Sequence, residues 1–250
     1  METATDGRRP RKGATLAVIG LLALLAFALL VGLGTWQLER RVWKLDLIAR
    51  VDARVRAAPT SPPPPSAWPA VSAERDEYRR VQVSGAFLPG QTLVEAVTTL
   101  GPGYWVMAPL RIDAGYTVLI NRGFAPDSVT PPAPPAHATV IGLLRMSEPH
   151  GGFLRANDPA RARWYSRDVS AIAAARGLRD VAPYFIDADA SPNPGGWPVG
   201  GLTVIRFPNS HLTYALTWYG LALLVITGGA LLVRDELRLR RGLAQRRAEE

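Results

Sequence analysis

The sequence of 250 residues contains no cysteine. This absence excludes disulfides, zinc sites built on thiolates, iron–sulfur clusters, covalently attached c-type haem and a thiol nucleophile. Methionine is also scarce, with three residues, which argues against a methionine-rich copper carrier. What the chain has in quantity is apolar residues, at 48%, and basic residues, which give a net charge of +8.

Sequence signatures of catalysis are missing as well. The chain has no G-x-S-x-G, no Walker loop and no H-E-x-x-H. The three histidines, His137, His150 and His211, are far apart in the sequence, and without cysteine they predict no zinc site. The nearest pair of acidic residues, Asp187 and Asp189, follows a predicted strand, and we interpret both as turn residues.

Two long runs without charge dominate the hydropathy pattern. Residues 14–35 and 212–233 each comprise 22 uncharged residues. At ~1.5 Å per residue, each run reaches roughly 33 Å as a helix, enough to cross a hydrocarbon core of about 30 Å. We therefore predict transmembrane helices at 14–35 and 209–233. A cleaved signal peptide is the alternative for the first run, but the run is longer than a signal peptide needs and lacks a small-residue cleavage site.

Basic residues flank both runs. Four precede the first run and six follow the second: Arg8, Arg9, Arg11, Lys12, Arg234, Arg238, Arg240, Arg241, Arg246 and Arg247. Because cytoplasmic flanks carry excess Lys and Arg, residues 1–13 and 234–250 are predicted to be cytoplasmic. Residues 36–208 then form a periplasmic domain of a multi-pass protein of the cell inner membrane. This placement of the charge predicts contact with the lipid bilayer and none with nucleic acid.

Residues 36–208 show both helical and strand patterns. Apolar spacings of three and four predict that 36–57 continues as a helix, which the proline-rich stretch 59–69 ends. Strand-like segments, of which 78–87 alternates most clearly, predict seven strands, at 78–87, 92–97, 104–111, 116–122, 139–145, 184–188 and 202–206. Residues 113–115 predict a hairpin turn, and 168–176 a short helix closed by Gly177. The expected fold is a membrane protein whose two transmembrane α-helices flank a mainly antiparallel α+β extracytoplasmic domain.

The start of the second apolar run carries a notable set of side chains. Residues 208–210 predict a helix start, so His211 falls in the first turn. Tyr214, Ala215 and Trp218 follow at helical spacing and form one stripe with His211, on which a flat apolar ring can lie. A helix N-terminus disfavours imidazolium, and neutral imidazole is the form that ligates iron. The alternative is an interfacial belt of amphipathic side chains.

Trp36 and Arg40 follow the first run at its outer end, four residues apart on one helical face. Arginine suits carboxylates such as haem propionates, because it stays charged and donates in pairs. Taken singly, Trp36 is more readily interpreted as a belt residue and Arg40 as a snorkelling one. Together with His211 at the same depth, they predict a possible site between the two helices.

Four blocks of sequence match a known pattern. They are Gly34–Arg40, Tyr78–Phe87, Val118–Pro126 and Asn209–Tyr219, and their sequences are GTWQLER, YRRVQVSGAF, VLINRGFAP and NSHLTYALTWY. Their content and order resemble the signatures of the surfeit locus protein 1 family. Each block alone is weak, but four in order between two spans are specific.

The resemblance implies a non-enzymatic assembly factor for haem–copper terminal oxidases, mainly cytochrome c oxidase. Bacterial members of the family are associated with binding haem a and helping it reach subunit I. His211 is then the implied axial ligand of the haem iron. Trp36, Tyr214 and Trp218 would supply apolar walls, and Arg40 a propionate partner.

Two other hypotheses stay open. The protein could be a membrane scaffold that stabilises subunit I or recruits haem a synthase without binding haem. It could also be an enzyme on a membrane anchor, for which Asp187 and Asp189 are the nearest acid pair. Elemental analysis is expected to find no stoichiometric zinc or copper.

Overall fold

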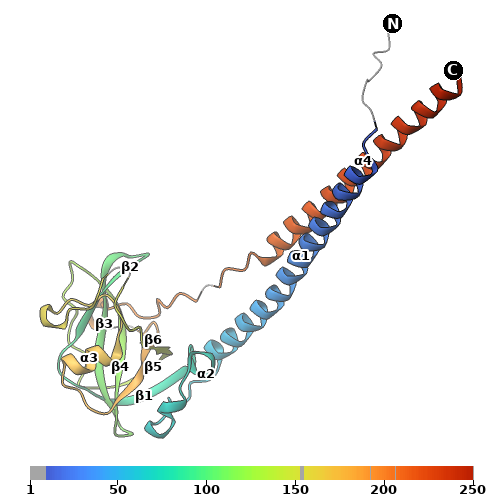
Figure 1. Cartoon of the computed structure of the whole chain (residues 1–250). Helices are drawn as coiled ribbons and strands as arrows, with labels where there is room; N and C mark the ends of the chain where they lie inside the picture. Colours follow the sequence, from blue (N-terminus) through green and yellow to red (C-terminus); the bar gives the residue numbers. More distant parts are fainter. Residues whose placement is uncertain (1–9, 153–154, 192, 206, 250) are drawn as a thin grey trace. The chain divides into compact units, whose positions relative to one another are not determined.

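The computed structural model of the chain describes residues 10–152, 155–191, 193–205 and 207–249 (Figure 1). It divides into two compact units, one comprising Met1–Ile48 with Phe207–Glu250 and the other Ala49–Arg206. Arg8 and Arg9 of the predicted basic flank, Arg206 of the last predicted strand and the final residue lie outside the described residues.

Two long helices contain the apolar runs. Helix α1 spans Gly13–Arg56 and helix α4 spans His211–Glu249. The most apolar 18-residue windows of these helices have mean hydropathies of 2.9 and 1.9, so both are long and apolar enough to cross a membrane. The predicted helical continuation beyond residue 36 is confirmed, since α1 ends at Arg56 just before the proline-rich stretch, where prolines lack the N–H that a helix needs.

The second unit contains six strands and short helices. The strands are β1 (Arg80–Phe87), β2 (Thr92–Thr98), β3 (Gly101–Ile112), β4 (Thr117–Pro126), β5 (His137–Met146) and β6 (Val181–Ala188). The helices are α2 (Ala73–Asp76), α3 (Val169–Ala175) and three 3₁₀ turns, η1 (Pro65–Ala70), η2 (Pro159–Arg161) and η3 (Pro194–Gly196). The predicted hairpin is confirmed, because Arg111 pairs with Thr117 across the turn.

One strand prediction is wrong. Residues 202–205 form no strand, although a strand was predicted at 202–206. A strand needs a neighbour with a free hydrogen-bonding edge. Strand β6, the last before this segment, is already paired with β4 on one edge and β5 on the other.

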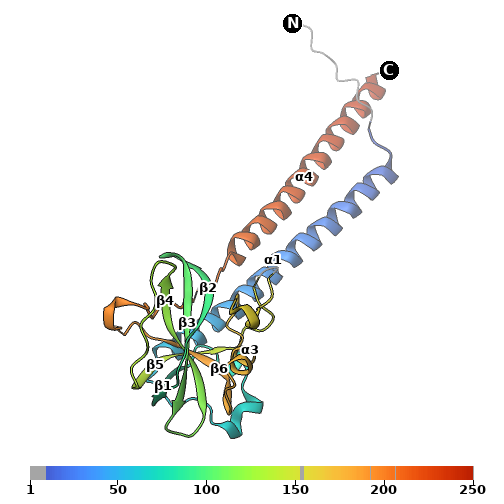
Figure 2. The ribbon, with the colours of Figure 1, turned by 90° about the vertical axis from the view of Figure 1, so that its left-hand side faces the viewer.

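The six strands form one sheet that closes on itself (Figure 2). The order is β1-β5-β6-β4-β3-β2, and β1 also pairs with the end of β3, so five strands make a ring and β2 extends from it. All pairs are antiparallel except β4 with β6, whose connection runs through β5 and α3. The mainly antiparallel α+β fold is therefore confirmed.

Strand β4 lies between two hydrophobic cores. Val118 and Ile120 face one core, which also contains Leu110, Tyr184 and Leu144. The intervening Leu119 faces the other core, with residues of β6 and α3: Phe185, Val169 and Ile172. Successive side chains of a strand point to opposite faces, so a strand enclosed on both sides is apolar throughout. The buried polar residues of these strands, Asn121 and Arg122 of β4 and Asp187 of β6, follow the apolar stretches that fill the two cores.

Candidate functional site

Helices α1 and α4 pack against each other as an antiparallel pair. The Thr35 hydroxyl lies 3.1 Å from the Tyr219 hydroxyl, and Gln37 meets His211, so contacts advance along one helix as they recede along the other. Gly34 is buried at this contact, where an added Cβ would lie 2.7 Å from the Tyr219 ring. The glycine of the first block therefore lets α4 approach closely, as small residues do in membrane helix pairs.

His211 is held by a side chain of the opposite helix. It is the first residue of α4 and half-buried, and its Nδ1 lies 2.7 Å from Gln37 Oε1. An amide oxygen only accepts, so Nδ1 carries the proton. In the neutral imidazole, Nε2 then keeps its lone pair, which is the arrangement found where a histidine ligates a metal and its other nitrogen donates to the protein.

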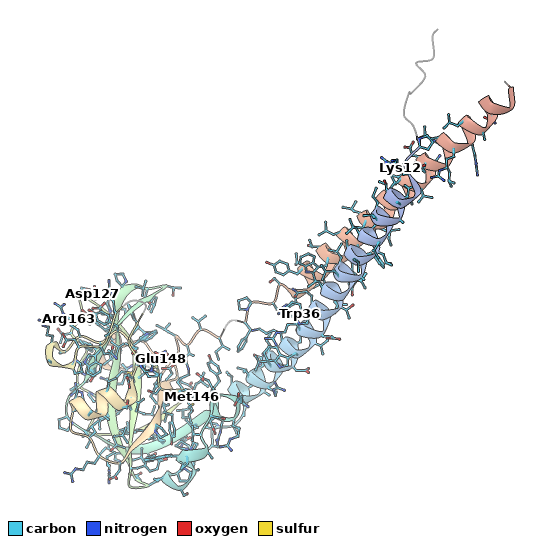
Figure 3. All side chains as sticks on the ribbon, in the orientation of Figure 1. Lys12, Trp36, Asp127, Met146, Glu148 and Arg163 are labelled. Atoms are coloured by element: carbon cyan, nitrogen blue, oxygen red, sulfur yellow. The ribbon has the colours of Figure 1, made fainter. Side chains whose placement is uncertain are left out.

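The remaining predicted site residues are distributed differently. Trp36 and Tyr214 are 54% and 53% exposed on their helices, and Figure 3 labels Trp36 on α1. Arg40 is exposed as well, with its guanidinium 4.0 Å from the ring centroid of Trp43. Among the described residues, no hydrogen bond or ion pair joins Arg40 to His211. The structure thus brings together His211 and Gln37, with Trp36, Tyr214 and Arg40 on accessible faces.

Trp218 has an unusual environment within the helix pair. Its indole Nε1 is buried and has no hydrogen-bond partner among the described residues. Trp218 lies two helical turns after His211, and Ala215, between them, is 1% exposed. Buried donors are almost always paired, so an unpaired one needs a reason such as a missing ligand.

Sequence reasoning missed Gln37. The residue stands in the first of the four matching blocks, beside Trp36, but it was not selected as part of a site. Its signal was an uncharged amide at the end of a long apolar run, where a polar side chain needs a partner. That His211 is this partner required the pairing of two helices 174 residues apart.

The sheet unit contains a second group of polar side chains, centred on Asp187. This carboxylate is 5% exposed and accepts four hydrogen bonds. The donors are Asn121 (2.8 Å), Arg145 (2.9 Å), Arg167 (3.1 Å) and Thr203 (2.8 Å). The interpretation of Asp187 as a turn residue is therefore wrong, since it lies within β6 and is buried among donors from β4, β5 and two loops.

Asp189, the other half of the predicted acid pair, follows β6. Its carboxylate binds Arg80 at 2.7 Å, and both side chains are about one-third exposed, at 32% and 35%. Asp187 binds Arg145 and Arg167, whereas Asp189 binds Arg80, so the two carboxylates do not form one acid–base pair.

Charges around Asp187 are closely balanced. Arg145 also pairs with Glu77 at 2.9 Å, and Arg167 with Glu148 at 2.5 Å. Burial by itself would raise the pKa of Glu148, but the hydrogen bond and charge of Arg167 outweigh it and lower that pKa. With both guanidiniums and all three carboxylates paired, this cluster fits a structural role at the rim of a cavity of about 200 Å³.

No group of three or more His, Asp or Glu residues that could hold a metal ion occurs in the described parts of the chain. Within the described part of the helix pair, Trp218 Nε1 is a buried donor without a partner, and His211 meets the opposite helix through Nδ1 rather than Nε2.

The four sequence blocks also lie within the region that matches known proteins. The sequence pattern of the SURF1 family matches residues 24–223, which include all four blocks. The chain belongs to the SURF1 family. The expected resemblance is confirmed, and the protein is membrane-anchored through its two apolar helices.

Relatives in this family extend from animals to a choanoflagellate. The chain is 37% identical to Surfeit locus protein 1 of Rattus norvegicus over 213 residues, 76% of this chain and 67% of the relative. It is 35% identical to Surfeit locus protein 1 of Homo sapiens over 229 residues, 82% and 73% of the two chains. With a SURF1-like protein of Monosiga brevicollis, identity is 35% over 215 residues, 78% and 80%.

Proposed function

We propose that this protein is a non-enzymatic assembly factor for cytochrome c oxidase that binds haem a and assists its insertion into subunit I. Family membership supports the role in oxidase assembly. The observation that carries haem binding is the hydrogen bond between His211 Nδ1 and Gln37 Oε1. It selects the tautomer whose Nε2 can donate to iron.

The side chains present fit haem as a cargo. The haem iron accepts an axial nitrogen ligand, and His211 offers one that is already oriented by α1. The buried indole of Trp218 supplies an unused donor, and the exposed rings of Trp36 and Tyr214 supply apolar surface. Arg40 is accessible and remains our proposed partner for a propionate.

Transient capture follows from this donor set. A single histidine ligand, without a second ligand from the described residues of the helix pair, gives moderate rather than permanent binding. We propose that haem a is received near haem a synthase and passed to subunit I, both of which contact the protein in the membrane.

We propose a membrane topology in which the protein lies in the cell inner membrane, with both termini in the cytoplasm and the sheet unit in the periplasm. Basic side chains flanking the helices support this. Phosphatase fused after Ala136 is expected to be active and the same fusion after Arg241 inactive. An inactive fusion at Ala136 refutes the topology.

The haem proposal is tested by absorption spectra of protein purified from cells that make haem a. His211→Ala is expected to abolish or sharply reduce bound haem. Gln37→Leu keeps the imidazole but removes its acceptor, so haem affinity is expected to fall about tenfold to hundredfold. His150→Ala, in a loop of the sheet unit, is the matched control and should bind as the parent does.

Undiminished haem in the His211→Ala variant, with an unshifted Soret band, contradicts haem ligation. That result leaves the scaffold hypothesis, in which the protein stabilises subunit I or recruits the synthase without binding haem. Equal protein loading and equal helix content by circular dichroism ensure that the comparison concerns binding and not folding.

A further inference from the structure

The sheet unit contains a buried arginine with no acidic partner. Arg122, on β4, is 4% exposed. Its Nη1 donates to Gln91 Oε1 and to the carbonyl of Pro132, both at 2.7 Å, and its Nη2 lies 3.5 Å from Asn193 Oδ1. All three acceptors are neutral. No carboxylate pairs with Arg122 among the described residues.

Two half-buried arginines of this unit, in contrast, have acidic partners. Arg145 and Arg167 are 15% and 12% exposed, and each binds carboxylates on more than one side. A desolvated charge is costly unless it is paired, which those two ion-pair sets achieve. At Arg122 the hydrogen bonds to neutral acceptors offset this cost only in part, and burial lowers the pKa of its guanidinium.

The guanidinium also has unused donors. Arginine carries five N–H groups in a planar fork. Two on Nη1 and one on Nη2 face the neutral acceptors, so Nε and the second Nη2 hydrogen have no acceptor among the described residues. The Nε–Nη2 edge is the one that binds a carboxylate through two parallel hydrogen bonds.

A cavity of about 180 Å³ lies beside this side chain. Arg122 and Asn193 contribute polar groups to it, and Phe87, Ile120 and Ile141 contribute apolar walls. Asp189 lines the cavity as well, but its carboxylate is already bound to Arg80 at 2.7 Å. The cavity therefore offers one positive charge without a carboxylate partner among the described residues, and an apolar wall.

We propose that this cavity is a binding site for a carboxylate carried on a short aliphatic stem, with Arg122 as its charged partner. One guanidinium matches one negative charge, so a monocarboxylate fits better than a phosphate dianion. The apolar side chains accommodate methylene groups, and Asn193 holds the guanidinium from the side, since its Oδ1 accepts from Arg122 and its Nδ2 donates to the Pro198 carbonyl. The carboxylate belongs either to a free small acid or to a glutamate side chain of a protein partner.

The test measures thermal unfolding of the full chain in non-ionic detergent, at constant ionic strength, against increasing butyrate. The midpoint is expected to rise saturably with butyrate and to stay unchanged with butyramide, which has the same shape but no charge. N-acetylglutamate amide distinguishes the two sources. If both N-acetylglutamate amide and butyrate stabilise the protein, a glutamate side chain can enter the cavity. If butyrate alone does so, the ligand is a free acid.

Two variants locate the effect. Arg122→Gln is expected to weaken butyrate binding about tenfold or more, because charge-assisted bonds are lost. Arg163→Gln, at an exposed arginine of the same unit, is the control and should respond as the parent does. If Arg122→Gln does not fold, Ala138→Leu fills the cavity without altering the guanidinium and should also abolish the response.

A parent protein that responds equally to butyrate and butyramide, or to neither, overturns the proposal. So does a response that persists in the folded Arg122→Gln or Ala138→Leu variant. Either result would leave Arg122 as a clamp that joins the loops bearing Gln91, Pro132 and Asn193. The test is independent of haem binding, since none of these residues belongs to the helix pair.

Discussion

Replacing Asp187 by asparagine preserves the shape of the most heavily bonded side chain of the sheet unit and removes its charge. In the parent, Oδ1 accepts from Asn121 and Arg167, and Oδ2 accepts from Arg145 and Thr203. Asparagine has one acceptor oxygen, so its amino group must face two of these four donors.

The less costly orientation is identifiable. If the amino group takes the place of Oδ2, the Thr203 hydroxyl can rotate and accept, but the Arg145 guanidinium cannot. One charge-assisted bond is lost, at ~1.5–3 kcal/mol, and one buried donor faces another, at ~1–3 kcal/mol. Arg145 keeps its ion pair with Glu77 at 2.9 Å, which limits the loss. We therefore expect the unfolding free energy to fall by about 3 kcal/mol, less than the sum of the upper limits of the two costs.

Asp189→Asn is the matched control, two residues along the same chain. It removes a carboxylate that makes a single ion pair, with Arg80, in which both side chains are about one-third exposed, at 32% and 35%. Such pairs contribute about 1 kcal/mol or less. Both variants are compared by urea unfolding of the full chain in detergent, followed by far-UV circular dichroism. Equal losses for the two variants, or a loss below 1 kcal/mol for Asp187→Asn, would refute this account of the buried cluster.

Three further outcomes follow from single contacts. Gly123→Ala is expected to destabilise the sheet unit by at least about 2 kcal/mol in the same urea assay, because Gly123 has φ of +125° and an added Cβ would meet the Val199 carbonyl. Gly34→Val is expected to separate the helix pair, measured as loss of a spin-label distance between α1 and α4, because its Cβ would lie 2.7 Å from the Tyr219 ring. The Asp76 carboxyl has its pKa lowered from 3.8, since the backbone bond from Ser72 and the charge of Arg79 outweigh desolvation. Its stabilisation is therefore present above about pH 4 and lost as the pH falls through the lowered pKa, so unfolding of Asp76→Asn should depend less on acid between pH 5 and pH 2.

The membrane helices and most strands were predictable because their signals are local. A run of 22 uncharged residues predicts a span by length alone, and α1 and α4 contain both runs. Strand periodicity located β1 to β6 within a few residues, since alternation reflects the two faces of a strand. Residues 202–205 also have a strand-like sequence, but β6, the strand before them, already has a partner on each edge.

Site residues were predictable only where position along a helix implied chemistry. His211 was selected because it opens a helix beside aromatic residues, and the structure places it as the first residue of α4. Its partner Gln37, the unpaired indole of Trp218 and the exposure of Trp36 depend on how α4 packs on α1. Helix packing is a long-range property that the periodicity of either helix does not contain.

By itself, the sequence determined that this chain has two apolar helices, a mainly antiparallel domain between them and membership of the SURF1 family, because composition, periodicity and motif order are properties of the linear chain. Only the tertiary structure decided which polar groups are satisfied. It buried Asp187 among four donors, oriented His211 through Gln37, and buried Arg122 with no carboxylate partner in the described part of the chain. Desolvation and hydrogen bonding depend on neighbours brought together from distant segments, so the same residue types acquire structural or binding roles only after the chain has folded.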